Sequence, residues 1–248
     1  MKTLFLAWQA PDVRQWFPVG RLEADVEHSS YVFQYTGGAI EAQRDGFHPM
    51  ASFPRLEDRY QSEELFPMFK NRVLGHQRKN FAEYLQSLDL DRNDPIEILA
   101  ITGGERQTDS FEVFPKIERQ PDNSFSCRFF LHGLRHMTDA AQARATTLQT
   151  GESLGVSVEL TNPKTGLAIQ LTSEDYAFVG WTPRYLVGDL LQAIAQTQRI
   201  GAKVVRVNAQ DVPANRRVLV ELTGYLPEGF EPMASELFLP IVSSAFRH

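Results

Sequence analysis

The side chains best suited to metal chemistry in this 248-residue chain are Cys127, His132 and His136. A thiolate and two imidazoles are common ligands of zinc. We expect residues 128–137 to form a β-strand, in which residues four apart lie about 13 Å from one another. Ligands of one tetrahedral ion cannot be so widely spaced. The pattern therefore predicts no shared metal site.

A second candidate for metal binding is the start of a calcium loop at Asp89, Asp91 and Asn93. An EF-hand loop needs glycine at its sixth position and glutamate at its twelfth. The chain has Asp94 and Ala100 at these positions. The sequence therefore predicts no calcium site.

Motifs for phosphate binding and covalent catalysis are missing from the sequence. It has no GxxxxGK[ST] phosphate loop, no GxGxxG, no GxSxG elbow and no HExxH pair. Carboxylates such as Asp58, Glu63 and Glu64 form no recognisable acid/base pair and are interpreted as a solvated face. These observations predict a non-catalytic protein that needs no cofactor.

The composition is that of an ordinary globular protein, with 42% apolar and 23% charged residues. The length allows one large domain or two small ones. The single Cys127 excludes an intrachain disulfide. Since we find neither a signal-peptide pattern nor an apolar run of about 18 residues, we expect a cytoplasmic protein without membrane contact.

The net charge of −6 argues against a generally basic nucleic-acid-binding protein. The charge is unevenly distributed, however. Residues 1–127 carry 14 Lys and Arg against 20 Asp and Glu, whereas residues 128–224 carry 10 against 8. The small excess of +2 either marks a local basic face or has no meaning, and the composition does not separate these readings.

The first third of the chain has the pattern of a small α+β module. Short strands are expected at 19–22 and 31–35, followed by a turn at Gly37-Gly38. Apolar residues at helical spacing predict helices over 62–74, 78–88 and 94–101. A strand is expected at 110–114, and the polar segment 116–124 is interpreted as a linker.

The second half has the pattern of a β-rich domain. Strands are expected at 128–137, 154–160, 167–172, 176–182, 203–208 and 217–222. An apolar stripe from Leu186 to Ile194 predicts one helix among them. This arrangement is typical of a small barrel or curled sheet. The overall fold class is therefore α+β.

The N-terminal part resembles the small N-terminal subdomain of HipA-type toxin kinases. The resemblance rests on "VGRLE", "YVFQYT", "HPMASFPR", "LFPMFKNRVLGHQRKNF" and "DPIEILAITGGERQTDSFEVFP" in that order. It implies a module over residues 1–115 that docks a protein partner. It does not imply kinase activity, because the chain has no room for the kinase body.

The second half resembles the HIRAN domain, through "FLHGLRHM", "GVSVELTNPKTGLAIQL" and "FVGWTPRYLVGDLLQAI". The resemblance implies an OB-like β-barrel with one helix over residues 125–226, followed by a C-terminal extension over 227–248. Members of this family fused to helicase-like proteins hold the 3′ end of single-stranded DNA. In general, aromatic rings stack on the bases and basic groups hold the phosphates.

The resemblance implies a set of nucleic-acid-binding residues: Arg135, His136, Asn162, Lys164, Thr165, Trp181 and Arg184. Arg135 matches the family arginine and His136 stands at an aromatic position, but Met137 replaces the second aromatic residue. Thr165 replaces the acid that would recognise a terminal hydroxyl. These exchanges favour phosphate contact over recognition of the 3′ end.

Each of these residues also has a purely structural interpretation. Asn162-Pro163 is a common turn pair, Trp181 could be a core aromatic residue, and Lys164 and Arg184 could be solvated charges. His136 alone is more often structural. Two functions therefore remain open. One is a nucleic-acid-binding accessory protein for single-stranded or 3′-end DNA. The other is a protein–protein interaction module, for example a regulator of a HipA-like toxin or defence system, without DNA binding.

Overall fold

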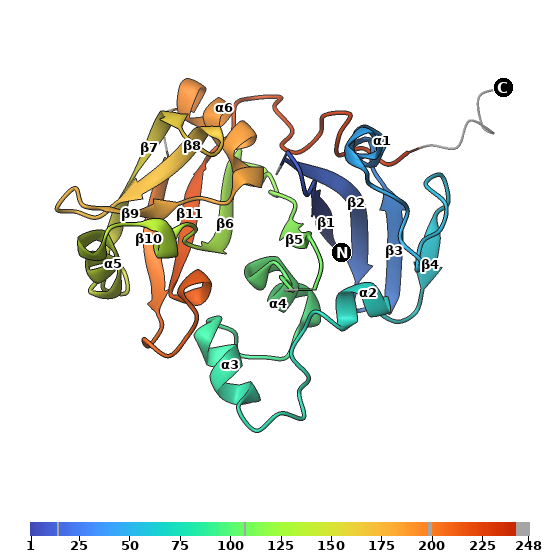
Figure 1. The fold of residues 1–248 in the computed structure, drawn as a ribbon, viewed down its shortest axis with the longest axis horizontal. Helices are drawn as coiled ribbons and strands as arrows, with labels where there is room; N and C mark the ends of the chain where they lie inside the picture. Colours follow the sequence, from blue (N-terminus) through green and yellow to red (C-terminus); the bar gives the residue numbers. More distant parts are fainter. Residues whose placement is uncertain (14, 107, 198–199, 242–248) are drawn as a thin grey trace. The chain divides into compact units, whose positions relative to one another are not determined.

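The computed structural model describes residues 1–13, 15–106, 108–197 and 200–241. They form an α+β structure with two antiparallel sheets (Figure 1). The chain divides into two compact units, and each contains one sheet. Unit 1 comprises residues 1–81, 93–116 and the chain from 233 onwards, and unit 2 comprises residues 82–92 and 117–232.

The sheet of unit 1 has the strand order β4-β3-β2-β1-β5. Its strands are β1 (Lys2–Gln9), β2 (Trp16–Asp25), β3 (Ser30–Tyr35), β4 (Tyr60–Ser62) and β5 (Phe111–Pro115). Three α-helices and one 3-10 helix belong to this unit: α1 (Gly37–Ala42), η1 (Gln43–Asp45), α2 (Pro67–Lys70) and α4 (Pro95–Thr102). Strand β1, which lies between β2 and β5, is outside the strands expected from the sequence, although five consecutive residues of it are buried.

Several expectations for unit 1 are confirmed and others are wrong. Helix α4 begins where expected, because the Asp94 side chain accepts hydrogen bonds from the backbone N–H groups of Ile96 and Glu97. The long helix expected over 62–74 is wrong, since only the single turn α2 forms. Pro67 stands at the first helical turn and limits the helix to residues that follow it. The Gly37-Gly38 pair begins helix α1 and is not a simple turn.

The C-terminal segment packs against unit 1. The backbone N–H groups of Gly37 and Gly38 donate hydrogen bonds of 3.0 Å to the carbonyl oxygens of Leu239 and Leu237. The Phe238 ring lies 4.9 Å from that of Phe5. Part of the expected extension 227–248 is therefore integral to this unit, while residues 242–248 lie outside the described part of the chain.

The sheet of unit 2 has the strand order β6-β11-β10-β7-β8-β9. Its strands are β6 (Ser124–Phe130), β7 (Ser153–Asn162), β8 (Gly166–Thr172), β9 (Phe178–Trp181), β10 (Ile200–Val207) and β11 (Val218–Tyr225). Its helices are α3 (Phe81–Ser87), η2 (Leu134–His136), α5 (Asp139–Thr146), η3 (Arg184–Leu186), α6 (Val187–Thr197) and η4 (Ala214–Arg216).

The sheet of unit 2 does not form the full ladder that would close a barrel in the described residues. The edge strand β9 is joined to the chain after β6 by a single bridge, between His132 and Trp181. The expected strand over 128–137 is also wrong beyond Phe130. The chain leaves the extended conformation at Gly133, whose φ of 80° is unfavourable for other residues, and continues as the 3-10 turn η2.

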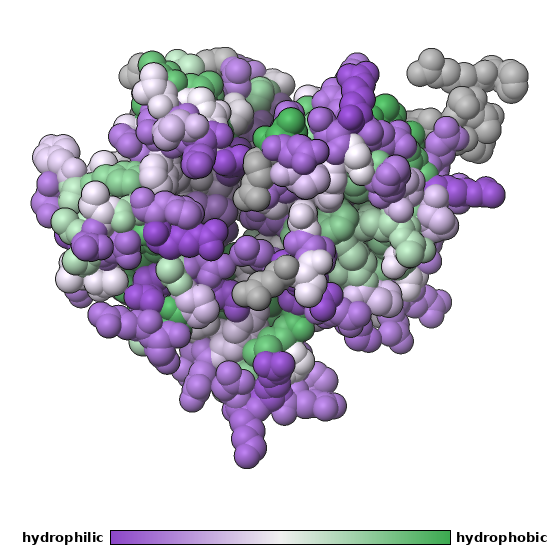
Figure 2. Space-filling model, viewed as in Figure 1, coloured by the Kyte–Doolittle hydropathy of each residue, from purple (hydrophilic) through white to green (hydrophobic). Residues whose placement is uncertain are grey.

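The surface of the protein is mainly hydrophilic on the face drawn in Figure 2, where apolar residues form small groups. Within the described residues, no helix has the length and apolar character needed to cross a membrane.

Candidate nucleic-acid interface

The turn between β7 and β8 is organised by Asn162. Its side-chain oxygen Oδ1 accepts hydrogen bonds from the backbone N–H groups of Lys164, at 3.0 Å, and Thr165, at 3.2 Å. The Thr165 hydroxyl donates to the Leu167 carbonyl at 2.7 Å. The turn interpretation of Asn162-Pro163 is therefore correct for the backbone. These bonds use only Oδ1 of Asn162, so its Nδ2–H group can donate to another residue.

Trp181 is half-buried at the end of β9, so its ring is neither enclosed in the core nor free in solvent. The indole Nε1–H donates a hydrogen bond of 2.7 Å to the Glu159 carboxylate. The Phe178 ring meets the indole edge-to-face at a centroid distance of 4.5 Å. The indole also lies so close to Gly133 that a Cβ atom there would collide with it. These contacts fix the orientation of the ring.

The Glu159 carboxylate links Trp181 to the hairpin turn. Its oxygen Oε2 accepts the indole N–H and also the Asn162 Nδ2–H, at 2.9 Å. The β7–β8 register shifts between Glu159 and Asn162, and this bulge brings the two side chains together. Two residues expected at the site, Asn162 and Trp181, are thus joined through a third that the sequence did not single out.

The chain after β6 lies beside Trp181. The backbone of His132 and that of Trp181 exchange two hydrogen bonds, of 3.0 and 3.2 Å. The turn η2 follows directly and carries Arg135 and His136, both exposed, with the Arg135 Nε–H donating to His136 Nε2 at 3.1 Å. The backbone bridge places His132, and with it the start of this turn, next to Trp181.

Arg184 is exposed in η3, three residues after Trp181, and its charge acts on the His132 imidazole. The pKa of His132 is lowered to about 4, mainly because the surrounding protein desolvates the ring and secondly because of the Arg184 charge. The residue as a whole still keeps an exposed surface. His132 is therefore neutral at pH 7. Lys164 is exposed in the hairpin turn, to which its backbone N–H contributes.

The structure therefore joins two of the expected residues directly, and the others lie on neighbouring turns of the chain. Asn162 and Trp181 are connected through Glu159, while Arg135, His136 and Arg184 lie on the turns that adjoin Trp181. The sequence did not single out Glu159, Phe178 and Gly133. Two features of the sequence point to Glu159 and Gly133. They are the Glu-x-x-Asn spacing before the hairpin turn and the glycine directly before Leu134-Arg135.

The structure changes the spacing argument that the sequence offered about a metal site at Cys127, His132 and His136. Residues 128–137 are not one extended strand, so the spacing argument does not hold. Cys127 is nevertheless buried in β6, and burial raises the pKa of its thiol to about 12, which keeps it protonated. Among the described residues, no group of three His, Cys, Asp or Glu side chains is arranged to hold a metal ion.

Comparison with known proteins gives structural neighbours only. No family model matches the chain, and no curated protein matches it significantly. Two solved structures are similar, each at 20% sequence identity and a TM-score of 0.32. One is a protein from Lactobacillus plantarum, for which 41% of this chain and 99% of that chain are covered. The other is the HIRAN domain of human HLTF, for which the shares are 44% and 84%.

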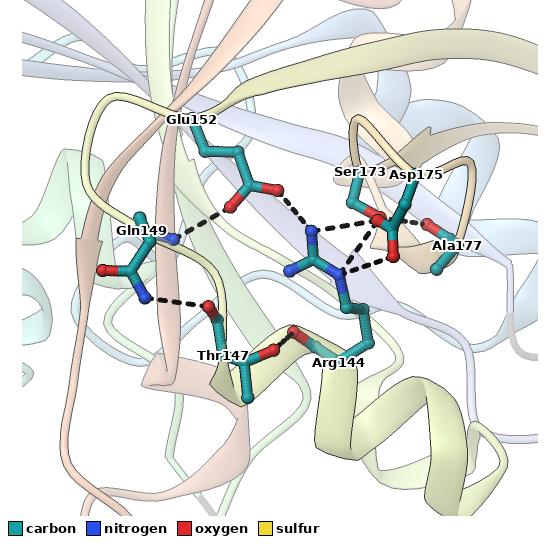
Figure 3. Close-up of polar contacts among 7 residues, drawn as sticks. All are labelled: Arg144, Thr147, Gln149, Glu152, Ser173, Asp175 and Ala177. Atoms are coloured by element: carbon teal, nitrogen blue, oxygen red, sulfur yellow. Dashed lines mark hydrogen bonds and ion pairs between the residues drawn. The ribbon is translucent and has the colours of Figure 1, made fainter.

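A second polar cluster in unit 2 centres on Arg144 of helix α5 (Figure 3). The guanidinium contacts the Glu152 carboxylate at 2.5 Å and the Asp175 carboxylate at 3.0 Å. The Gln149 backbone N–H and the Ser173 hydroxyl donate to the same two carboxylates. The cluster connects α5 with the β8–β9 turn and the start of β7, so its role is structural.

Proposed function

We propose that the protein is a non-catalytic nucleic-acid-binding protein that contacts single-stranded DNA through the surface around Trp181. The observation that carries this proposal is the half-buried indole, which is fixed by Glu159 and Gly133 and adjoins turns bearing Arg135 and Arg184. A fixed aromatic ring beside basic groups is the general arrangement for stacking a base and holding its phosphates. In this proposal, unit 1 docks a protein partner.

The test is a fluorescence anisotropy titration of short labelled single strands. We expect Trp181→Ala to weaken binding by about 1–3 kcal/mol, the typical cost of one lost stack. Leu160→Ala is the matched control, because Leu160 is a large apolar side chain of β7 that is 72% exposed, and its loss should leave affinity unchanged. Trp181→Ala binding as tightly as the natural protein would refute the assignment.

The salt dependence provides a separate test of the basic residues. Replacing both Arg135 and Arg184 by Ala should flatten the dependence of affinity on salt, because fewer counterions are released on binding. Asp139→Ala and Glu174→Ala change exposed charges of the opposite sign in the same unit and should not flatten it. An unchanged slope in the arginine variant would exclude the proposed phosphate contacts.

The 3′ end offers a third test. The Thr165 hydroxyl donates within the hairpin and is no carboxylate, so position 165 does not supply the charged acceptor that would recognise a terminal hydroxyl. We expect strands with free and phosphate-capped 3′ ends to bind equally. A strong preference for the free end would contradict this expectation. No binding of any strand at low salt would reject the proposed function and leave protein–protein interaction as the function to test.

A further inference from the structure

Glu159 and Trp181 lie on the same face of the sheet of unit 2. Glu159 is paired with Ala168, and Trp181 is paired with Gln170, on the shared neighbour β8. Side chains two residues apart on a strand point to the same face, and paired residues share a face. Glu159 is half-buried, so its carboxylate borders the surface that carries the indole.

The two oxygens of the Glu159 carboxylate have different surroundings. Both hydrogen bonds, from the indole of Trp181 and the amide of Asn162, go to Oε2. Within the part of the chain that the structure describes, Oε1 accepts no hydrogen bond, and the carboxylate forms no ion pair. One acceptor oxygen beside the stacking ring therefore remains available.

The charge of this carboxylate limits what can bind next to Trp181. Its two partners are neutral N–H groups, which orient it without neutralising it. A phosphate placed there would meet an unneutralised like charge. A group that donates a hydrogen bond would be favoured, and carboxylate side chains accept such bonds from the 4-amino group of cytosine.

We propose that Glu159 gives the site a base preference, accepting a hydrogen bond at Oε1 from the amino group of a base stacked on Trp181. This inference rests on the nucleic-acid-binding function proposed above. It predicts that bases with an exocyclic amino group, such as cytosine, bind better than those with a carbonyl oxygen at the same position.

The experiment compares oligo-dC with oligo-dU by anisotropy, since these pyrimidines differ only at the 4-position and the adjacent ring nitrogen. The natural protein should bind oligo-dC about tenfold more tightly, the value of one charge-assisted hydrogen bond. In Glu159→Gln, the amide oxygen can still accept from Trp181 and Asn162, which directs the amide N–H₂ to the place of Oε1. Because this group donates, Glu159→Gln should reverse the preference and favour oligo-dU.

Glu159→Ala is the second variant and should remove the preference in either direction. Thermal unfolding of Glu159→Gln should match that of the natural protein, because the hydrogen bonds to Trp181 and Asn162 are kept. Equal binding of oligo-dC and oligo-dU, or a preference that persists in Glu159→Gln, would overturn the inference and leave the proposed function intact. Failure of the natural protein to bind either strand would overturn both.

Discussion

The two units use aromatic side chains differently. In unit 1, Phe33, Phe53 and Phe69 are fully buried, with the Phe33 and Phe53 rings stacked at 4.0 Å. In unit 2, Trp181 is half-buried and is held by a hydrogen bond through its only polar atom. A buried ring contributes mainly to stability, whereas a fixed ring at the surface can contact a ligand at little cost in ordering.

The units also differ in how they hold arginine. The Arg72 side chain in unit 1 is 0% exposed and donates to the Gly104 carbonyl at 2.9 Å and to Asp109 at 2.7 Å. Arg144 in unit 2 contacts the carboxylates of Glu152 and Asp175 (Figure 3), and its side chain is 24% exposed. Removing a buried partner leaves unpaired polar groups, whereas water replaces an exposed one. We therefore expect the loss of the Arg72 side chain to lower the free energy of unfolding more than the loss of the Arg144 side chain.

The largest effect is expected for Phe33→Ala. Removing a fully buried ring that contacts Phe53, Tyr35 and Phe69 should lower the free energy of unfolding by about 3–5 kcal/mol. Urea denaturation measures this change. Val26→Ala is the control, because Val26 is 49% exposed and should change stability by less than about 0.5 kcal/mol. Equal effects of the two substitutions would contradict the described core.

The next effect is expected for Arg72→Met. The substitution leaves the Gly104 carbonyl and Asp109 without their donor and should cost about 3 kcal/mol. Arg72→Met combined with Asp109→Leu should cost less than the sum of the single changes, because the pair is removed together. Strict additivity in this double-mutant cycle would show that the two residues are not coupled.

A smaller effect is expected from the pH dependence of His132. Because the pKa is lowered to about 4 in the folded protein, the unfolded chain binds more protons between about pH 6.5 and 4. Stability should therefore fall as the pH decreases through this window and be constant above it. Since His132 is exposed, we expect the free energy of unfolding to fall by only about 1 kcal/mol. Urea denaturation at several pH values should show this slope weakened in His132→Gln.

The smallest effect is expected for Arg144→Ala, at most about 1 kcal/mol, because the Arg144 side chain is 24% exposed and that of its partner Asp175 is 61% exposed. The pKa of Glu152 is lowered mainly by the Gln149 N–H, and that of Asp175 mainly by the Ser173 hydroxyl. Both contributions are present above the ordinary carboxyl pKa values and are lost as the pH falls below about 4. A loss of stability comparable to that of Arg72→Met would contradict the comparison.

Local signals predicted many of the elements. Asp94 before Pro95 identifies the start of α4, and alternating apolar residues identify β7, β8 and β11. Helix α5 was not expected, although Thr138 accepts a hydrogen bond from the Ala141 N–H as its N-cap. Its alanine-rich sequence has too few apolar residues to give a strong helical pattern. Pro67 is a second local signal, because a proline favours the first turn of a helix and so indicates a start at this residue and not at Ser62.

The sequence by itself determined the α+β class and the chemical types of the candidate site residues, because both follow from local patterns and motif positions. Only the tertiary structure decided that Glu159 holds Trp181 and Asn162 together. That contact depends on a register shift between β7 and β8 and on the pairing of β9 with β8, which places Trp181 opposite Gln170. Such pairings join residues distant in the chain, and no local propensity specifies them.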